Sequence, residues 1–331
     1  MEGIRVQESA IQTERTVRTE TRNKIESLVD NIEKVIFGKR DVIKLCVVGL
    51  LARGHILIDD IPGIGKTTLA QGLARSIDCA FNRIQFTSDM LPADIIGVSI
   101  LDPATSQFEF RPGPVFSNVV LADEINRTPP KTQSALLEAM SEFHVTVDGK
   151  TRPLPDPFIV LATQNPIEYE GTYILPEAQL DRFLIRIEIG YPGVEDELRI
   201  VRRHDALTAL RELRPVLTAK DVLALQAEAR AIHVDETVEK YILAIIHATR
   251  NHEDIRLGAS PRGSLALYEA SQAYAMVDGR DFVTPGDVKV IAVPVLSHRI
   301  LTKSHGGNLV SSVRERIQIV VGILESISIP V

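Results

Sequence analysis

Two kinds of hydrophobic pattern divide the chain near residue 190. Before that point, short apolar runs such as residues 56–58, 119–122 and 158–163 alternate with segments whose apolar residues recur every three or four positions. Short continuous apolar runs are typical of buried strands, and the longer periodic segments are typical of helices that pack on them. Beyond residue 190 the helical pattern continues without strands. The pattern predicts an α/β domain followed by an all-helical domain.

The chain begins with a polar stretch that lacks apolar periodicity. Residues 1–22 are dominated by Glu, Arg, Thr and Gln, which predicts a frayed or partly helical tail, either solvated or bound to a partner. Helical spacing begins at residues 24–35, and a second helix is expected at about residues 39–52. We therefore divide the chain into a tail (1–22), a core (23–190) and a helical domain (191–331).

Two β-hairpins are expected inside the α/β part. Residues 97–101 and 107–110 alternate between apolar and polar side chains on either side of a turn-forming stretch. Residues 144–147 and 151–154 flank an Asp-Gly dipeptide, which is typical of two-residue hairpin turns. A hairpin in the middle of an α/β unit is an insertion.

Helical periodicity organises the last part of the chain. An amphipathic segment is expected at residues 195–204, with further helices at about residues 236–250 and 262–277. The last helix must dock its apolar face, either on the helical domain or at a subunit interface. That face carries Val313, Ile317, Val320, Val321 and Leu324.

Capping residues mark where several helices start. Thr218 with Asp221, and Thr284 with Asp287, have the spacing of a capping box, in which each side chain bonds the backbone N–H of the other. Thr128 precedes two prolines and is expected to cap the helix that follows.

A glycine-containing turn connects the strand at residues 56–58 to a helix. Phosphate groups bind a concave ring of backbone N–H groups, which requires side chains to be absent where the backbone closes, as at Gly63 and Gly65. The following helix adds its positive N-terminal end. Lys66 would reach the β and γ phosphates of ATP, and the Thr67 hydroxyl would bind the Mg²⁺ that bridges them. The expected nucleotide-binding residues are Pro62, Gly63, Ile64, Gly65, Lys66, Thr67 and Thr68.

One position departs from the phosphate-loop pattern G-x-x-x-x-G-K-[ST]. Asp60 stands where the pattern has its first glycine. Aspartate tolerates unusual backbone angles, but its carboxylate would lie near a polyphosphate and could weaken binding. One hypothesis is therefore a scaffold that binds ATP and scarcely hydrolyses it, in which Asp60→Gly would raise turnover.

A second buried strand ends in two acids. Residues 119–122 lead directly into Asp123 and Glu124. In an ATPase the first acid holds Mg²⁺ through water, and the second polarises the water that attacks the γ phosphate. Asn165, at the tip of the strand over residues 158–163, is expected to position that water, the alternative being a loop cap.

A short apolar turn precedes the second helix. In nucleotide-binding domains of this layout such a turn often covers the adenine, which here would involve Ile36, Phe37 and Gly38. Packing in the core is an equal alternative for these residues.

Composition narrows the class of protein. The 331 residues are 44% hydrophobic and 24% charged, with a net charge of −7, which indicates a soluble globular chain without a global basic surface for nucleic acid, although local basic loops stay open. Cys46 and Cys79 lack metal-site spacing and are expected to be buried thiols in a reducing compartment. No run of 18 apolar residues or signal peptide is present, so no membrane span is expected and the expected compartment is the cytoplasm.

Taken together, the motifs resemble the MoxR family of AAA+ ATPases. The resemblance covers most of residues 35–300. It rests on residues 61–68, residues 121–127 continuing at 130–140, residues 162–166, residues 170–173 with 175–183, and residues 258–262. It implies a five-stranded parallel sheet, a helical lid and assembly into a homo-oligomeric ring, usually a hexamer.

The resemblance also implies roles for two arginines. Arg182 looks like the arginine finger, which reaches the γ phosphate bound by the neighbouring subunit; a surface salt bridge with Asp181 or Glu177 is the alternative. Arg262 looks like the sensor-2 arginine of the lid, acting on its own subunit's nucleotide or on a neighbour's.

The two hairpins match insertions found in the branch of AAA+ proteins that includes MoxR, magnesium chelatase and the MCM helicases. Such loops face the ring pore. Phe108, Phe110 and His144 would then contact a substrate, unless they pack on their own domain.

The sequence thus predicts a Mg²⁺-dependent ATPase that works as a ring and remodels or activates a protein client in a chaperone-like way. By resemblance the client is often a von Willebrand factor A domain protein. The rival functions are a chelatase-like motor subunit, a nucleic-acid motor, which the charge of −7 disfavours, and the scaffold with weak turnover.

Overall fold

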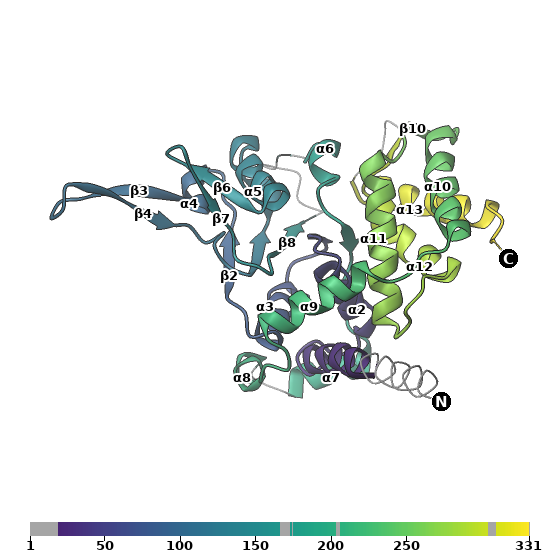
Figure 1. The fold of residues 1–331 in the computed structure, drawn as a ribbon, viewed down its shortest axis with the longest axis horizontal. Coiled ribbons are helices and arrows are strands. Elements are labelled where there is room, and N and C mark those ends of the chain that lie inside the picture. The colour runs from purple at the N-terminus through teal and green to yellow at the C-terminus, as the bar shows by residue number, and fades with distance from the viewer. Residues whose placement is uncertain (1–18, 166–172, 174, 203–205, 304–308, 331) are drawn as a thin grey trace, which may run out of the picture.

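A five-stranded parallel sheet forms the centre of the computed structural model shown in Figure 1. The structure describes residues 19–165, 173, 175–202, 206–303 and 309–330. The strands lie in the order β2 (Phe81–Gln85), β5 (Val119–Asp123), β8 (Ile159–Gln164), β1 (Ile56–Asp59) and β9 (Ile185–Ile187). The predicted five-stranded parallel sheet is confirmed. Because β1 lies between β8 and β9, the chain segments that follow these strands meet at one edge of the sheet.

The two faces of the sheet bury separate hydrophobic cores. Side chains alternate along β1, so that Ile56 and Ile58 pack toward α2 (Arg40–Leu51) and α3 (Lys66–Ser76), while Leu57 packs toward α4 (Pro92–Ile96) and α5 (Pro130–Glu142). A strand buried on both faces has apolar residues at every position. This explains the continuous apolar runs in the sequence.

Two antiparallel hairpins extend from the core, as predicted. The first, β3 (Gly97–Asp102) with β4 (Gln107–Pro112), projects from the body of the molecule in Figure 1. The second consists of β6 (His144–Val147) and β7 (Lys150–Pro153).

The aromatic residues of the hairpins have different environments. Phe110 packs edge-on against Phe116, with ring centroids 5.7 Å apart, and the guanidinium of Arg152 lies 3.8 Å from its ring centroid. A ring nitrogen of His144 bonds the carbonyl of Glu142. Phe108 is 74% exposed. Phe110 and His144 therefore contact their own domain, and Phe108 is presented to the outside.

The helices after β9 form two groups. The first group lies near α2 and α3 in Figure 1 and consists of α7 (Val194–Arg202), α8 (Ala206–Glu212) and α9 (Ala219–Arg230). The second group packs against α2 and β9 and consists of α10 (Glu236–Asn251), α11 (Pro261–Val277), α12 (Pro285–Leu296) and α13 (Leu309–Ser326), with the short pair β10 (Ile255–Leu257) and β11 (Leu301–Thr302). Both groups share one continuous core with a face of the sheet.

The predicted helix starts are largely confirmed. Asp221 and Thr218 exchange the two bonds of a capping box at the start of α9, and Asp287 and Thr284 do so at the start of α12. The prediction for Thr128 is wrong, because α5 begins at Pro130 after Pro129, which carries no capping side chain.

The first and last helices lie at the two ends of the described chain. The N-terminal helix is present by residue 19 and ends at residue 33, so it reaches into the stretch predicted as a tail. The last helix, α13, docks on α10 and α12, with Val320 and Leu324 in the core. Among the helices that the structure describes, none has the length and apolarity to cross a membrane.

Candidate active site

A cavity of about 460 Å³ lies beside the loop that joins β1 to α3. The loop and the first turns of α3 form one wall. The other walls come from the turn before α2, from the chain after β9, and from α7 and α8. The cavity is lined by Val35, Ile36, Phe37, Lys39, Pro62, Gly63, Ile64, Gly65, Thr68, Ile189, Gly190, Tyr191, Pro192, Glu197, Ile200, Val201 and Ala209.

The glycine loop has the backbone geometry that an anion cradle requires. Gly63 and Gly65 have φ angles of 86° and 96°, in the left-handed region that side chains disfavour. No atom lies within 4 Å of the position that a Cβ of Gly63 would take, so this part of the loop faces open space. Gly65 is also the N-cap of α3, whose first N–H groups therefore point into the loop. The loop and helix together suit a phosphate group.

Lys66 occupies the first helical position, directly beside this cradle. Its Nζ donates a hydrogen bond to the backbone carbonyl of Asp60, at 2.8 Å. Burial lowers the pKa of Lys66, while the carboxylates of Asp123 and Asp60 oppose that effect. A lysine with acids on one side and the loop on the other is suited to a polyphosphate that brings its own negative charge.

Asp60 does not project its carboxylate toward the phosphate cradle. Oδ2 accepts hydrogen bonds from the backbone N–H groups of Ile189 and Gly190, both at 2.7 Å, and Oδ1 accepts one from Ile61 at 2.9 Å. The side chain is buried, and its φ is not positive, so glycine is not required here. The concern that Asp60 repels the nucleotide is not supported by this geometry. Asp60 instead ties the loop to the chain that follows β9.

The two acids at the end of β5 are fixed by side chains of the neighbouring strands. Asp123 accepts a hydrogen bond from the Thr163 hydroxyl at 2.6 Å and from the Arg83 guanidinium at 2.6 Å. Glu124 adopts a left-handed backbone conformation (φ 59°) just before the short 3₁₀ turn Ile125–Arg127, and its carboxylate accepts a bond from Gln85 at 2.7 Å.

These partners were not identified from the sequence. Arg83 and Gln85 are two residues apart on β2, so their side chains share a face of the sheet. This spacing in the sequence could have indicated that both side chains act at the same place. Thr163 lies on β8 and also accepts a hydrogen bond from the backbone N–H of Glu124. The three side chains orient the acids from both flanking strands.

Hard oxygen ligands for a magnesium ion are present where the sequence predicts them. Asp123 ends β5, and Thr67 lies in the first turn of α3, partly exposed. Mg²⁺ in nucleotide sites takes one or two such protein oxygens, with phosphate and water oxygens completing its octahedron. The residues therefore fit the ion.

The structure places Asn165 just after β8, between the strands that carry the acids and the loop. Its side chain is buried, and β8 pairs with both β5 and β1. This location agrees with the predicted role in positioning water, which stays a prediction.

The apolar end of the cavity combines predicted and unpredicted residues. Ile36 and Phe37 line it, whereas Gly38 lies in a neighbouring cleft that also borders Phe37. Tyr191, Ile200 and Val201 contribute the facing wall, and they were missed as site residues although the amphipathic segment was recognised. The amphipathic pattern of α7 indicated that one face of this helix is apolar, but the sequence alone could not show that this face lies against a ligand.

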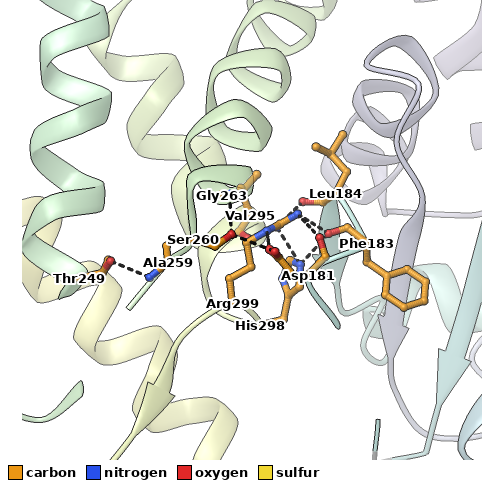
Figure 2. A network of polar contacts seen from close by, with 10 residues as sticks. All are labelled: Asp181, Phe183, Leu184, Thr249, Ala259, Ser260, Gly263, Val295, His298 and Arg299. Carbon is orange, nitrogen blue, oxygen red and sulfur yellow. Dashed lines mark hydrogen bonds and ion pairs between the residues drawn. The ribbon is translucent and has the colours of Figure 1, made fainter. Parts of the chain in front are cut away.

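The lining of this cavity includes neither candidate arginine, and it also excludes Lys66, Thr67, Asp123, Glu124 and Asn165. Arg182 follows α6 (Glu177–Leu180) and donates to the Leu137 carbonyl and the Ser141 hydroxyl of α5, both at 2.6 Å. Arg262 is exposed in the first turn of α11. Asp181 pairs with Arg299, at 2.9 Å, rather than with Arg182. Figure 2 shows Asp181 and Arg299 together, and Arg299 is a residue that sequence reasoning missed.

Comparison with known proteins agrees with the fold. Residues 55–185 match the sequence model of the ATPase family associated with various cellular activities (AAA), and residues 247–318 match that of the AAA lid domain. A crystal structure of a protein from Cytophaga hutchinsonii, described as a candidate ATPase, superposes with a TM-score of 0.87 and 38% identity over 97% of this chain and 99% of that one. The fold and the site define an AAA+ ATPase with its lid.

Two relatives narrow this class. The chaperone MoxR1 of Mycobacterium tuberculosis is 42% identical over 84% of this chain and 75% of its own length. The protein YeaC of Bacillus subtilis, whose function is not characterised, is 52% identical over 82% of this chain and 85% of its own. The chain belongs to the MoxR family of AAA+ ATPases.

Proposed function

We propose that this protein hydrolyses Mg²⁺-ATP as a homo-oligomeric ring, which by family resemblance is a hexamer. It uses the cycle of ATP binding and hydrolysis to remodel or activate a protein client. The observation that carries the proposal is one arrangement of functional groups. The phosphate cradle and the buried Lys66 follow β1, the two oriented acids end β5, and β8 lies between these two parallel strands, so the groups meet at one edge of the sheet.

Each residue has a role that follows from its position. Backbone N–H groups around Gly63 and Gly65 bind the phosphates, and Lys66 neutralises the β and γ groups. Thr67 and Asp123 would hold Mg²⁺, whose charge would stabilise the negative charge that develops on the phosphates. Glu124 polarises the attacking water and Asn165 orients it. Ile36, Phe37 and the apolar side of α7 enclose the adenine.

Assembly into a ring is supported by where the arginines lie. Arg182 is held against α5 by the Leu137 carbonyl and the Ser141 hydroxyl, and Arg262 is exposed at the start of α11. The Asp181 carboxylate joins the segments that carry them through Ser260. We infer that both act on the nucleotide of a neighbouring subunit. A cation supplied in trans stabilises the transition state only in the assembled ring.

The proposed client is a protein. The relative MoxR1 is named a chaperone. The β3–β4 hairpin exposes apolar side chains on both of its faces, Val98 and Ile100 on one and Leu101 and Phe108 on the other, each at least 42% exposed. Such a surface suits a loosely folded polypeptide in the ring pore. A von Willebrand factor A domain protein in the cytoplasm is the client class proposed by family resemblance.

The test is ATP hydrolysis measured against protein concentration, with molecular mass tracked in parallel. The specific rate should climb as rings form. Lys66→Ala should lose nucleotide binding, and Glu124→Gln should bind ATP, favour the ring and stop turnover. Arg211→Ala, at an exposed arginine of α8, serves as the control and should behave like the wild type.

The finger assignment is tested by mixing subunits. Arg182→Ala should bind nucleotide normally and fail to hydrolyse it. In rings that combine Arg182→Ala with Glu124→Gln, each interface with an intact Glu124 facing an intact Arg182 should recover activity. Mixed rings that form and stay inactive would remove Arg182 from the finger role, and stimulation of turnover by DNA would favour a nucleic-acid motor.

A further inference from the structure

The segment that carries Arg182 is held from two sides. Residues 181–184 connect α6, which has a single turn, to the edge strand β9. On the core side, Arg182 bonds α5 and the Phe183 ring is fully buried. On the other side, the contacts come from His298 and Arg299, just after α12 and more than 100 residues later in the chain.

Arg299 makes most of these later contacts. Its guanidinium donates through Nε to Asp181 Oδ1 at 2.9 Å, through Nη2 to the Phe183 carbonyl at 2.6 Å, and through Nη1 to the Leu184 carbonyl at 2.9 Å. His298 bonds the same Phe183 carbonyl, at 2.9 Å. Figure 2 shows these donors converging on the short segment. One planar guanidinium thus fixes a carboxylate and two backbone carbonyls at once, which a lysine ammonium could not do in the same geometry.

The charge of Arg299 is buried together with that of its partner. The Arg299 side chain is 2% exposed and that of Asp181 is 20% exposed. Burial lowers the pKa of Arg299 to about 10, with Asp181 opposing the shift, so the arginine remains charged at neutral pH. A buried ion pair restricts geometry more than it adds stability, because much of its attraction offsets desolvation.

Asp181 also connects to the lid helix that carries Arg262. Its second oxygen, Oδ2, accepts a hydrogen bond from the Ser260 hydroxyl at 2.9 Å, and Ser260 is the N-cap of α11. Arg262 is two residues further along that helix. Asp181 therefore links its neighbour in the chain, Arg182, to the start of α11.

We propose that Asp181 and Arg299 form a positioning pair that sets where a subunit presents Arg182 and Arg262 to its neighbour's nucleotide. This inference rests on the proposed trans role of Arg182. The pair forms hydrogen bonds with residues 181–184 and Ser260, and not with the phosphate loop or the acids at the end of β5. Loss of the pair leaves the subunit's own phosphate loop and acids intact and misplaces its finger. A misplacement of about 1 Å can cost roughly 10²-fold in rate.

The experiment uses the full chain with Arg299→Gln and, separately, Asp181→Asn. Each variant should bind a labelled nucleotide with unchanged affinity and assemble, while kcat falls by about 10². Arg299→Lys keeps the charge beside Asp181 and should recover part of the loss. Ser260→Ala should have a smaller effect, because it removes one of the two contacts on the carboxylate.

Subunit mixing separates positioning from general damage. In rings of Arg299→Gln with Glu124→Gln, the first subunit supplies an intact active site and the second an intact finger, so activity should return. In rings of Arg299→Gln with Arg182→Ala no interface has a positioned finger, so activity should stay absent.

A matched control comes from the opposite end of α12. The Arg280 guanidinium pairs with the buried carboxylate of Asp287, and Arg280→Gln should lower thermal stability and leave turnover per assembled ring unchanged.

Two results would overturn the inference while leaving the proposed finger in place. One is full turnover in both Arg299→Gln and Asp181→Asn. The other is a loss that Glu124→Gln subunits fail to restore although Arg182→Ala rings are restored by them. If Arg182→Ala rings themselves keep full turnover, the proposed finger is wrong and this inference falls with it.

Discussion

The Asp60 carboxylate provides the sharpest test of the structure, because the sequence pattern and the tertiary contacts predict opposite results. On the pattern alone, Asp60→Gly restores the usual glycine of a phosphate loop and should raise turnover. In the structure the same change removes the acceptor of three backbone N–H groups, those of Ile61, Ile189 and Gly190. We therefore expect Asp60→Gly to reduce both stability and activity.

The size of the effect follows from those contacts. A buried donor left without its acceptor costs about 1–3 kcal/mol, and two of the three donors lie across the gap between the loop and the chain after β9. The added freedom of glycine in the unfolded chain contributes up to about 1 kcal/mol. A total of about 4 kcal/mol corresponds to a fall in Tm of roughly 10 °C for a domain of this size. Asp60→Asn keeps one carbonyl oxygen and should cost about half as much.

Function should decline with the same contacts. Ile189, Tyr191 and Pro192 line the cavity, and Asp60 fixes that stretch to the phosphate loop. Nucleotide affinity should therefore fall several-fold in Asp60→Gly. The assays are thermal unfolding, binding of a fluorescent nucleotide and steady-state hydrolysis.

The control is Asp156→Asn. Asp156 is 49% exposed and pairs with Arg53 on the surface, so its loss should shift stability by less than about 1 kcal/mol. An Asp60→Gly protein that keeps the wild-type Tm and hydrolyses ATP faster would refute the reasoning, and would return attention to the scaffold with weak turnover.

Three further predictions follow from other contacts. Gln85→Ala should raise turnover in the absence of a client, by up to about tenfold, because Gln85 donates a charge-assisted bond to Glu124 that restrains its carboxylate; an unchanged rate would show that this bond does not restrain Glu124. His55 is buried and bonds the Val160 N–H and the Met140 carbonyl, and burial lowers its pKa to about 4. Its neutral form therefore stabilises the fold above pH about 6.5, and up to about 3 kcal/mol of that stability should be lost as the pH falls toward 4. Urea unfolding at several pH values gives the free energy of unfolding as a function of pH, and this dependence should be weaker in His55→Asn than in the wild type. An equal dependence in both proteins would contradict the assignment. Cys46 is buried as predicted, whereas the prediction of a buried Cys79 is wrong, because that side chain is partly exposed. Burial raises the pKa of Cys46 to about 12, so its thiol should react with a disulfide reagent at pH 7 only after unfolding, and rapid labelling of Cys46 in the native protein would argue against its burial.

Local chemistry at fixed spacing explains what could be predicted. Gly63, Gly65 and Lys66 act through the backbone of one turn, and Asp123 with Glu124 directly follows an apolar strand, so their relation to the fold is visible within a few residues. The capping pairs Thr218–Asp221 and Thr284–Asp287 are local for the same reason. The parallel sheet follows from hydrophobic periodicity.

Contacts between distant segments explain what could not be predicted. Asp60 finds its partners 129 and 130 residues later, and Arg299 finds Asp181 118 residues earlier. The apolar face of α7 was visible in the sequence, but whether it lines a nucleotide cavity depends on how the chain returns after β9. A single sequence does not show which distant residue will bond a given hydrogen-bond acceptor or pair with a given buried charge.

The sequence by itself determined the class of this protein, because phosphate binding and hydrolysis require particular residues at short, fixed intervals. Tertiary structure alone decided how that site is arranged. The sequence suggested that the Asp60 carboxylate repels the nucleotide, whereas in the fold it bonds the chain after β9 to the phosphate loop. The fold also places Arg182 and Arg262 outside the cavity beside that loop. The physical reason is that a buried carboxylate or guanidinium is stable only where folding brings enough donors or acceptors around it, and those groups come from remote parts of the chain.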